Sequence, residues 1–489
     1  MKNKKGFTLI ELLAVIVVLA IIALITVPQI LGMTSKSRNQ ASLRSLEGHI
    51  RNIDNQLAMD KFQNDTKSGS YTFENLNLEN FPKKDHLRCE EYEVNNNVVY
   101  EAKNCLIDEK NYCYLDSQVI ECSELENTLK NQILADNTFI TKEPILYNTN
   151  WHFKDQNGLY SIDVTNGYSN GVNGKTYYFR GDVTNNYVKF GKWKSDLYGG
   201  STNAPNMGGI KKYESLTECQ NDEFYNIDCT KIHGIDDDMY WKIVRINEDG
   251  TIRMILDSEI DANYYQYSGK IVTEYMDNNS YKQYDSYTDV YYSKSYIKTI
   301  VDKWYGETLG SDEKYNSKVA QGNYFCEAAT VSYYSPNAIM NATLLPAAQA
   351  YPYTIGDEMY IGTISGEYLP NYKCVTDGNG YGLVNSKVGL LTYDEVVFAG
   401  GFPYVSNDKF YLYNKNKLKR LNYWTMSPAG INSSTSSESI NVWQFASDEP
   451  IVVRTSNTYH AVPVINLKAS VMATKEYDEA LGVDVYVVE

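Results

Sequence analysis

The chain has 489 residues and a formal net charge of −16 at pH 7. A nucleic-acid-binding protein needs a basic face, so this balance argues against a nucleic-acid partner. The length predicts two or three domains, and 44 tyrosines with only 12 prolines, spread among short turn signals, predict β-rich structure.

A long apolar segment near the amino terminus follows a short basic stretch. Between Phe7 and Leu31 the only polar residues are Thr8, Glu11, Thr26 and Gln29. About 20 apolar residues cross the hydrocarbon core of a bilayer. Lysines at positions 2, 4 and 5 favour a cytoplasmic amino terminus. The pattern therefore predicts a single-pass helix in the cytoplasmic membrane, with the rest of the chain on the outer side.

The run from Lys5 to Glu11, Lys-Gly-Phe-Thr-Leu-Ile-Glu, resembles the class III signal of type IV pilins and pseudopilins. In that family a prepilin peptidase cleaves after the glycine, here Gly6, and methylates the new amino terminus, here Phe7. The family's glutamate, here Glu11, pairs with the amino terminus of a neighbouring subunit. The resemblance implies a leader peptide at 1–6, with prepilin peptidase and other pilin subunits as partners.

The physics of burial agrees with this resemblance. A carboxylate within a membrane helix is costly, so Glu11 needs a partner, and in a filament core the free amine of an adjacent subunit is one. Three other interpretations stay open: a plain single-pass anchor, a cleaved secretory signal, and a glutamate placed there by chance. A secretory signal is cut after its apolar region at a small-residue site, and no clear Ala-x-Ala follows.

The helix is predicted to continue beyond the apolar segment. Pro28 predicts a kink, and pilin-like proteins commonly carry a proline at this point. Beyond Lys36, apolar residues recur at spacings of three and four: Leu43, Leu46, Ile50, Ile53 and Leu57. This spacing is typical of one face of an amphipathic helix, which in pilins packs on a sheet. We expect one helix over 7–62, first hydrophobic and then amphipathic.

The eight cysteines are Cys89, Cys105, Cys113, Cys122, Cys219, Cys229, Cys326 and Cys374. An even number outside the membrane favours disulfides. Sequence proximity suggests pairing each cysteine with the next one along the chain, and an exchanged pairing among the first four stays open. Because no Cys-x-x-Cys occurs and the five histidines are scattered, zinc is disfavoured and no metal site is predicted.

We expect an α+β fold, with a cysteine-bearing globular region at 63–148 and a large β-rich domain at 149–489. Several elements of the large domain are predicted individually. Strands are expected at Thr176–Arg180 and Tyr187–Phe190, joined by a turn, and in a hairpin of Tyr240–Ile246 with Thr251–Leu256, whose loop ends in Asp249-Gly250. Residues 290–305 and 311–320 favour helical or mixed structure, and Leu391–Ala399 favours a short element that stops at Gly400. Ala461–Leu467 predicts a late core strand, where Pro463 favours an edge or a bulge.

Residues 240–470 are also similar to C-type-lectin-like folds such as the formylglycine-generating-enzyme superfamily. The similarity rests on the strands at Tyr423–Ser427 and Val442–Phe445 and on Val462-Pro463-Val464. That family often has an arginine before the proline, where this chain has Val462. No binding or catalytic residue is transferred from a likeness of fold.

The sequence predicts no enzyme and no cofactor. It contains neither a His-Glu-x-x-His motif nor a Gly-x-Ser-x-Gly motif. An active site assembled from distant residues stays open, as does a calcium ion at Asp236–Asp238 or at Asp377–Gly382.

Together, these features lead to one functional hypothesis and two alternatives. The favoured interpretation is a large pilin subunit, a minor one by its size, which moves from the membrane to a surface pilus and displays a β-rich head, for example for adhesion to a surface ligand. The first alternative is a pseudopilin of a type II-like secretion system. The second is a membrane-tethered extracellular protein with a binding or hydrolytic role.

Overall fold

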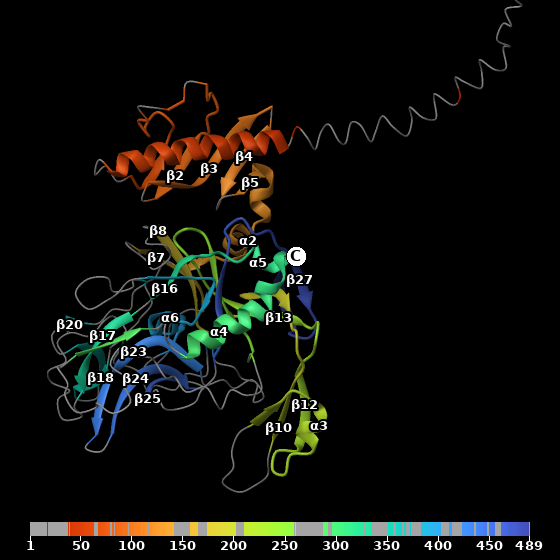
Figure 1. Cartoon of the computed structure of the whole chain (residues 1–489), viewed down its shortest axis with the longest axis vertical. Helices are drawn as coiled ribbons and strands as arrows, with labels where there is room; N and C mark the ends of the chain where they lie inside the picture. Colours follow the sequence, from red (N-terminus) through yellow and green to blue (C-terminus); the bar gives the residue numbers. More distant parts are fainter. Residues whose placement is uncertain are drawn as a thin grey trace, which may run out of the picture. The chain divides into compact units, whose positions relative to one another are not determined.

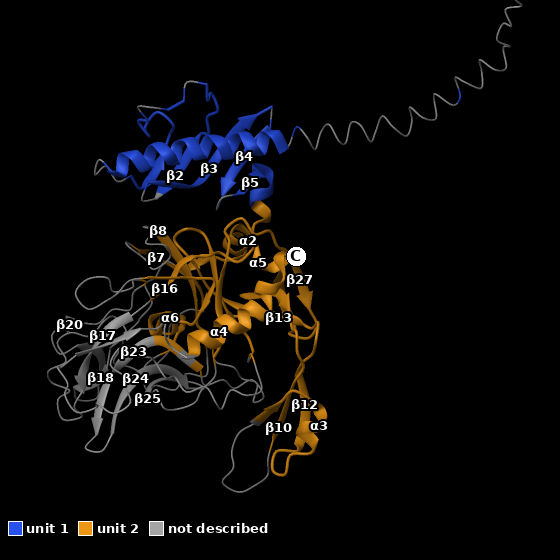
Figure 2. Cartoon of the chain, viewed as in Figure 1, with its two compact units in different colours: residues 1–125 blue, residues 126–489 orange. Residues whose placement is uncertain are grey.

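The computed structural model describes residues 38–62, 67–140, 157–164, 174–201, 210–260, 287–334, 351–367, 383–401, 423–454 and 461–488, with short gaps inside some of these ranges, and also residues 17, 372 and 410–412. The chain forms two compact units, 1–125 and 126–489 (Figure 2). The expected boundary at 148/149 falls in a segment outside the described residues and stays a prediction. A long helix with β-rich globular structure confirms the α+β fold class.

In unit 1, the described part of the helix runs to residue 62 and lies across an antiparallel sheet (Figure 1). The sheet has the strand order β1-β2-β3-β4-β5. Its strands are β1 (Gly69–Tyr71), β2 (Glu91–Asn95), β3 (Val98–Ile107), β4 (Lys110–Leu115) and β5 (Gln118–Glu121). Each strand pairs with the next along the chain, so the sheet is a meander built from local connections. The 3-10 helix η1 (Cys122–Asn127) follows it.

The apolar stripe of this helix packs against the sheet as predicted. Leu46, Ile50, Ile53 and Leu57 are at most 1% exposed and join Tyr92, Val94, Val99 and Ala102 in one apolar cluster. Each such side chain contributes about 1.5–3 kcal/mol of transfer free energy when fully buried. Asn97, in the β2–β3 turn, has a φ of 66° and donates from its amide to the carbonyl oxygen of Leu57 at 2.7 Å. This hydrogen bond therefore joins the β2–β3 loop to the C-terminal part of the helix.

Unit 2 is organised around a ten-stranded sheet. Its main path is β22-β26-β14-β13-β8-β7-β6, and β9 pairs with both β13 and β28. The strands are β6 (Phe139–Ile140), β7 (Gly158–Val164), β8 (Gly174–Arg180), β9 (Tyr187–Lys192), β13 (Asp238–Ile246), β14 (Ile252–Leu256), β22 (Val388–Gly389), β26 (Val464–Leu467), β27 (Thr474–Asp478) and β28 (Val483–Val487).

The predicted β13–β14 hairpin forms the centre of this sheet. Trp241 lies opposite Leu256 and Ile246 opposite Ile252, and all four side chains are at most 2% exposed. Gly250 has a φ of 83°, which supplies the left-handed conformation that the turn requires.

The strands β8 and β9 form where expected, but they do not pair with each other. Both pair with β13: β8 beside Arg245 and Ile246, and β9 further along, beside Tyr240 to Lys242. The strand β13 therefore receives two successive partners on one side. The expectation for Pro463 is wrong. β26 lies between β22 and β14, so it is an interior strand, and Pro463 precedes its first residue, where it needs no ladder donor.

Helices cover parts of unit 2 (Figure 1). They are α2 (Leu129–Asp136), α3 (Leu216–Gln220), α4 (Tyr296–Glu307), η4 (Leu309–Ser311), α5 (Glu313–Asn316) and α6 (Tyr393–Ala399). Helical structure at 290–305 and 311–320 is thus confirmed in α4 and α5, and α6 ends at Gly400 as predicted, with a φ of 121° at that glycine.

Smaller sheets complete the described part of unit 2. They have the orders β11-β10-β12, β15-β17-β23-β24-β25, β16-β21 and β18-β19-β20. Their strands are β10 (Leu197–Ser201), β11 (Ile210–Tyr213), β12 (Ile227–His233), β15 (Tyr287–Tyr291), β16 (Gly322–Cys326), β17 (Ala328–Tyr334), β18 (Tyr351–Ile355), β19 (Glu358–Thr363), β20 (Gly366–Glu367), β21 (Leu383–Ser386), β23 (Tyr423–Ser434), β24 (Ser437–Ala446) and β25 (Glu449–Arg454). The β11-β10-β12 sheet and α3 project from the main sheet of the unit (Figure 1).

Candidate functional site

The predicted processing and assembly residues, Gly6, Phe7, Glu11 and Pro28, all lie outside the described residues. Their roles in cleavage, methylation and subunit pairing therefore stay predictions. Within the part of the chain that the structure describes, no helix is both long and apolar enough to span a membrane. The site that the structure does describe begins with the amphipathic half of the helix.

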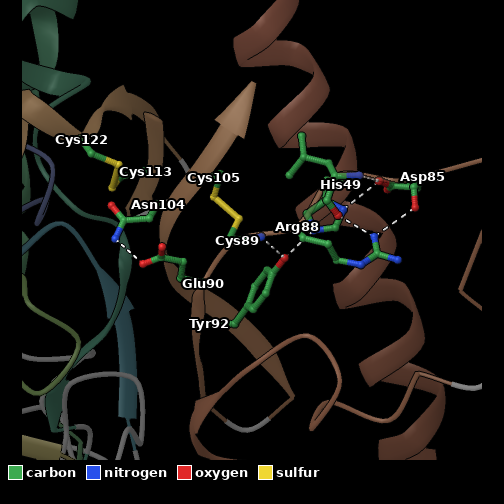
Figure 3. The surroundings of a disulfide bond; sticks show 11 residues. His49, Asp85, Arg88, Cys89, Glu90, Tyr92, Asn104, Cys105, Cys113 and Cys122 are labelled. Atoms are coloured by element: carbon green, nitrogen blue, oxygen red, sulfur yellow. Dashed lines mark hydrogen bonds and ion pairs between the residues drawn. A yellow bond between two sulfur atoms is a disulfide. The ribbon is translucent and has the colours of Figure 1, made fainter. Parts of the chain in front are cut away.

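Two disulfides fix the sheet that receives this helix (Figure 3). Cys89 pairs with Cys105, which ties the segment before β2 to β3, and Cys113 pairs with Cys122, which ties β4 to the start of η1. In unit 2, Cys219 of α3 pairs with Cys229 of β12. These are the pairings suggested by sequence proximity, not the exchanged ones. Cys374, the expected partner of Cys326, lies outside the described residues, so that pairing stays a prediction.

A buried histidine lies between the helix and the sheet (Figure 3). His49 is 1% exposed, and its Nδ1 lies 2.9 Å from Asp85 Oδ1 while its Nε2 lies 2.7 Å from Tyr92 Oη. Tyr92 Oη accepts a hydrogen bond from the Cys89 backbone N–H at 2.8 Å. The neutral ring satisfies every contact when Nδ1–H donates to Asp85 and Nε2 accepts from the Tyr92 hydroxyl.

The surroundings of His49 favour this neutral form. Burial lowers the pKa of the His49 ring and outweighs the opposing attraction of the Asp85 carboxylate. The guanidinium of Arg88, which lies 3.5 Å from the centre of the Phe73 ring, lowers the pKa further. The sequence analysis missed this residue. Its position in the sequence would have indicated burial. His49 follows Leu46 by three residues and precedes Ile53 by four, so it lies on the apolar face of the helix.

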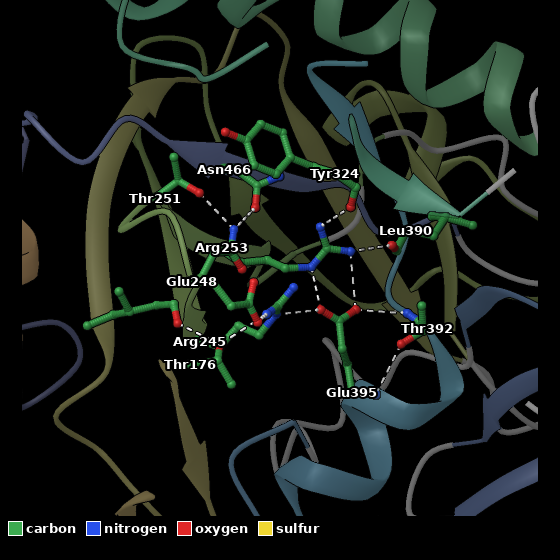
Figure 4. Close-up of polar contacts among 12 residues, drawn as sticks. Thr176, Arg245, Glu248, Thr251, Arg253, Tyr324, Leu390, Thr392, Glu395 and Asn466 are labelled. Atoms are coloured by element: carbon green, nitrogen blue, oxygen red, sulfur yellow. Dashed lines mark hydrogen bonds and ion pairs between the residues drawn. The ribbon is translucent and has the colours of Figure 1, made fainter. Parts of the chain in front are cut away.

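Unit 2 contains a second buried polar cluster (Figure 4). The Glu395 carboxylate lies between two guanidinium groups, with Oε1 3.4 Å from Arg245 Nε and Oε2 3.2 Å from Arg253 Nη2. Arg245 also pairs with Glu248 at 3.1 Å. All four side chains are fully buried. Two cations balance two anions, which is how a low-dielectric interior tolerates charge.

This cluster positions α6. Glu395 accepts a hydrogen bond from the Thr392 backbone N–H at 2.9 Å, and the Thr392 hydroxyl accepts one from the Glu395 N–H at 3.1 Å, which makes a capping box. Arg253 donates to the carbonyl oxygens of Tyr324 and Leu390 at 3.0 and 3.1 Å. The cluster joins α6 to β13 and β14, so it is a structural framework.

A pocket of about 480 Å³ opens where several strands of unit 2 end. It lies next to the last residue of β9, the end of β12, the start of β13 and the residues after β14. The residues that line it are Lys192, Trp193, Ile232, His233, Asp236, Asp237, Asp238, Tyr240, Asp257 and Ser258. The Trp193 and His233 rings stack with centroids 3.7 Å apart. The turn before β13 is fixed by the Asp236 N–H, which donates to the Trp193 carbonyl oxygen at 2.9 Å.

Most charges around this pocket are paired. Lys242 lies 3.0 Å from Asp257 and donates to the Tyr411 carbonyl oxygen at 2.9 Å. Burial works to lower the pKa of the Lys242 ammonium, but the charges of Asp257 and Tyr187 outweigh it, and the pKa is raised. Lys192 pairs with Asp238 at 2.5 Å. Each of the pocket carboxylates Asp238 and Asp257 is therefore neutralised by a lysine.

The sequence analysis left it open whether Asp236–Asp238 bind a calcium ion. Across the described ranges, no three His, Cys, Asp or Glu side chains form a group that would hold a metal ion. The other candidate calcium loop, Asp377–Gly382, lies outside the described residues. The sequence analysis did not identify Trp193, Tyr240 or Ser258, because these residues come from separate strands and share no local motif.

Comparison with protein families gives one match. Residues 1–27 match the model described as the prokaryotic N-terminal methylation motif. Searches of the curated proteins and of the solved structures each found no significant match. The matched segment holds Gly6, Phe7 and Glu11, and the described helix that packs on the sheet of unit 1 begins further along the chain, at residue 38. The similarity of 240–470 to C-type-lectin-like folds stays a prediction.

Proposed function

We propose that this chain, which is a precursor of the type IV pilin or pseudopilin type, becomes a minor subunit of a surface filament. The observation that carries the proposal is the methylation motif at 1–27, which comes before the amphipathic helix described from residue 38 to residue 62. The motif supplies processing by a prepilin peptidase after Gly6, methylation of Phe7, and assembly with other pilins through Glu11. No catalytic role is proposed.

The structure of unit 1 supports this role. Its helix buries one face, through Leu46, Ile50, Ile53 and Leu57, in the sheet of its own unit. Because this face already packs within its own subunit, it does not contact the membrane or other subunits. The apolar segment that precedes it would contact the membrane first and the filament core later. The disulfides Cys89–Cys105 and Cys113–Cys122 suit an oxidising space outside the cytoplasm.

Unit 2 supports the role of a displayed head. It spans residues 126–489 and is built around its own ten-stranded sheet. A head of this size is difficult to repeat in every subunit of a filament, which favours a minor position and display at the surface. Adhesion to a surface ligand is the role we propose for this head.

The mature amino terminus tests the first step. The chain would be produced with its prepilin peptidase and recovered from the membrane, and the amino-terminal peptide would be measured by mass spectrometry. We expect N-methylated Phe7 as the first residue of the mature chain. In a Gly6→Leu variant, we expect the leader to stay attached. An uncut Met1, or a cut beyond residue 31, would refute the proposal.

Glu11→Ala tests the assembly step. We expect normal cleavage, because the cut lies before Phe7, and a strong loss of the chain from sheared surface filaments. Thr8→Ala, three residues before Glu11 in the same motif and without a charge change, serves as the control. Normal filament incorporation of Glu11→Ala would contradict the pairing role.

A further inference from the structure

The helix of unit 1 has a second face, which points away from the sheet. Its residues recur at spacings of three and four, as the buried residues do, but on the opposite side of the helix. All six are exposed, and together they are called the outward face: Arg44, Gly48, Arg51, Asn55, Ala58 and Phe62. Phe62, at the end of this face, is 91% exposed and supplies apolar surface.

Gly48 lies in the middle of the outward face, inside the helix. A glycine lowers the stability of a helix interior relative to alanine. A Cβ added at Gly48 would have no atom within 4 Å outside its own stretch of helix, and the φ of Gly48 is not positive. The packing of unit 1 therefore does not require a glycine there. A glycine on an exposed helix face lets the backbone of a second helix approach closely.

The charges of the outward face have one sign. Arg44 and Arg51 are two helical turns apart, which is about 10 Å along the helix axis. Neither forms an ion pair with a described residue. Glu47 lies beside the face, between the two arginines in sequence, and pairs with neither. A surface that complements this face carries carboxylates at the same spacing.

A membrane surface is too far from this face to be its partner. In the continuous helix predicted over 7–62, Arg44 follows Leu31, the last residue of the apolar segment, by 13 residues. This separation corresponds to about 20 Å along the axis. The headgroup region of a bilayer is roughly 5–8 Å thick on each side. The arginines therefore lie beyond the reach of the lipid headgroups.

A second copy of this chain is also a poor partner. Helices that leave the same membrane in the same direction run parallel, so two outward faces would place Arg44 against Arg44 and Arg51 against Arg51. Like charges that are brought together in an interface lower the affinity. Such repulsion is a common way to exclude a wrong partner.

We propose that the outward face docks a helix of a different subunit, whose own exposed face carries carboxylates about two turns apart. The inference rests on the proposed function, since that subunit would belong to the same filament, and it names the kind of neighbour that this chain accepts. It also gives a physical reason for a minor position, because the chain does not stack on itself through this face.

The charges can be tested without the partner subunit, because a charge-reversed copy of the chain supplies an acidic face. Two differently tagged full-length chains would be produced together and purified in detergent, one unchanged and one carrying Arg44→Glu and Arg51→Glu. We expect this mixed pair to copurify about tenfold more than two unchanged chains or two reversed chains. Equal recovery of the three combinations would overturn the proposal, and stronger pairing of two unchanged chains would identify a second copy as the partner.

A matched control keeps the change in net charge but places it outside the outward face. Lys61 and Lys84 are exposed, belong to unit 1 and are not part of this face. The double variant Lys61→Glu/Lys84→Glu changes the charge by the same amount as the reversal of the two arginines. We expect no gain in copurification with the unchanged chain. An equal gain would show general attraction between the chains and would refute the role of Arg44 and Arg51.

Substitutions of Gly48 separate docking from folding. Because a Cβ at this position meets open space, Gly48→Ala should increase the protection of the 40–62 peptides against hydrogen exchange. In the unchanged partner of the mixed pair, Gly48→Ala should weaken copurification and Gly48→Leu should weaken it more, because larger side chains hold the two helices apart. Full recovery of the mixed pair with Gly48→Leu would contradict a close approach at this residue.

The docking tests do not depend on processing. If Phe7 were found unmethylated while the mixed pair still formed, the filament role would fail and this inference would stand. If Phe7 were methylated and the chain entered filaments, but charge reversal changed nothing, only this inference would fail.

Discussion

The two compact units are stabilised in different ways. In unit 1, each strand pairs with its neighbour in sequence, and one helix face, two disulfides and a buried histidine complete the core. In unit 2, the sheet joins distant segments, and the ion cluster links Arg253 to Glu395 across a sequence separation of 142 residues. Local connections with covalent links suit a small core, whereas a larger core can hold a buried charge cluster. The units should therefore respond to different perturbations.

The largest effect is expected from the charge cluster of unit 2. Glu395→Gln keeps the shape and the capping box but leaves two buried guanidinium groups with one carboxylate: Arg245 keeps Glu248, and Arg253 loses its ion-pair partner. We expect a loss of about 3–5 kcal/mol in the unfolding free energy of unit 2. All six tryptophans lie beyond residue 150, so tryptophan fluorescence during urea unfolding reports on this unit alone.

Glu307→Gln is the matched control for that experiment. Glu307 lies on α4 in the same unit and pairs with Lys303 at 3.9 Å, with both side chains about two-thirds exposed. A surface pair of this kind contributes at most about 1 kcal/mol. If the two glutamine variants were equally stable, the cluster would not be what holds α6 in place.

The next effect concerns the helix face of unit 1. Ile53→Ala opens a cavity at a fully buried position, and we expect it to lower the unfolding free energy of unit 1 by about 2–5 kcal/mol. Hydrogen exchange of the peptides from 40–62 would measure it. Met59→Ala, on the same helix at 57% exposure, should change exchange little. Equal protection in both variants would contradict packing of the stripe on the sheet.

Removing a disulfide should also act on unit 1 only. The double variant Cys89→Ala/Cys105→Ala opens a loop with a sequence separation of 16, for which the chain-entropy argument gives a loss of about 3 kcal/mol. We expect faster exchange in 91–115 and an unchanged tryptophan unfolding curve. A shift of that curve would show that the two units unfold together.

The smallest effect is expected from pH. Burial raises the pKa of Asp54 to about 6. The hydrogen bond that its carboxylate accepts from the Val99 backbone N–H acts to lower the pKa, but burial is the larger effect. Because the folded state holds this proton more tightly than the unfolded state does, the stability of unit 1 should fall as pH rises from about 4 to about 6. Asp54→Asn should remove this fall, which is about 1–2 kcal/mol after allowance for solvent screening.

The lowered pKa of His49 gives the opposite slope below its ordinary value of 6.5. The measurement is therefore the difference between Asp54→Asn and the unchanged chain, in which the contribution of His49 cancels. Exchange of the 40–62 peptides at pH 4, 5, 6 and 7 provides it. A difference that is constant over this range would contradict a raised pKa at Asp54.

Local patterns account for much of the fold. The stripe from Leu46 to Leu57 has helical spacing, and Asp249-Gly250 between alternating apolar residues specifies a hairpin, so both features are encoded within a few residues. The same is true of the run from Gly6 to Glu11, whose motif the family match confirms.

Tertiary structure alone decided the rest. Both β8 and β9 pair with β13, and Pro463 precedes an interior strand, because strand order depends on contacts that no short window contains. The pocket depends in the same way on Trp193, Asp236 and Ser258 coming together from separate strand ends. Spacing along the chain determines which face of an element is apolar, whereas the position of one element beside another follows from how all the apolar faces are buried together.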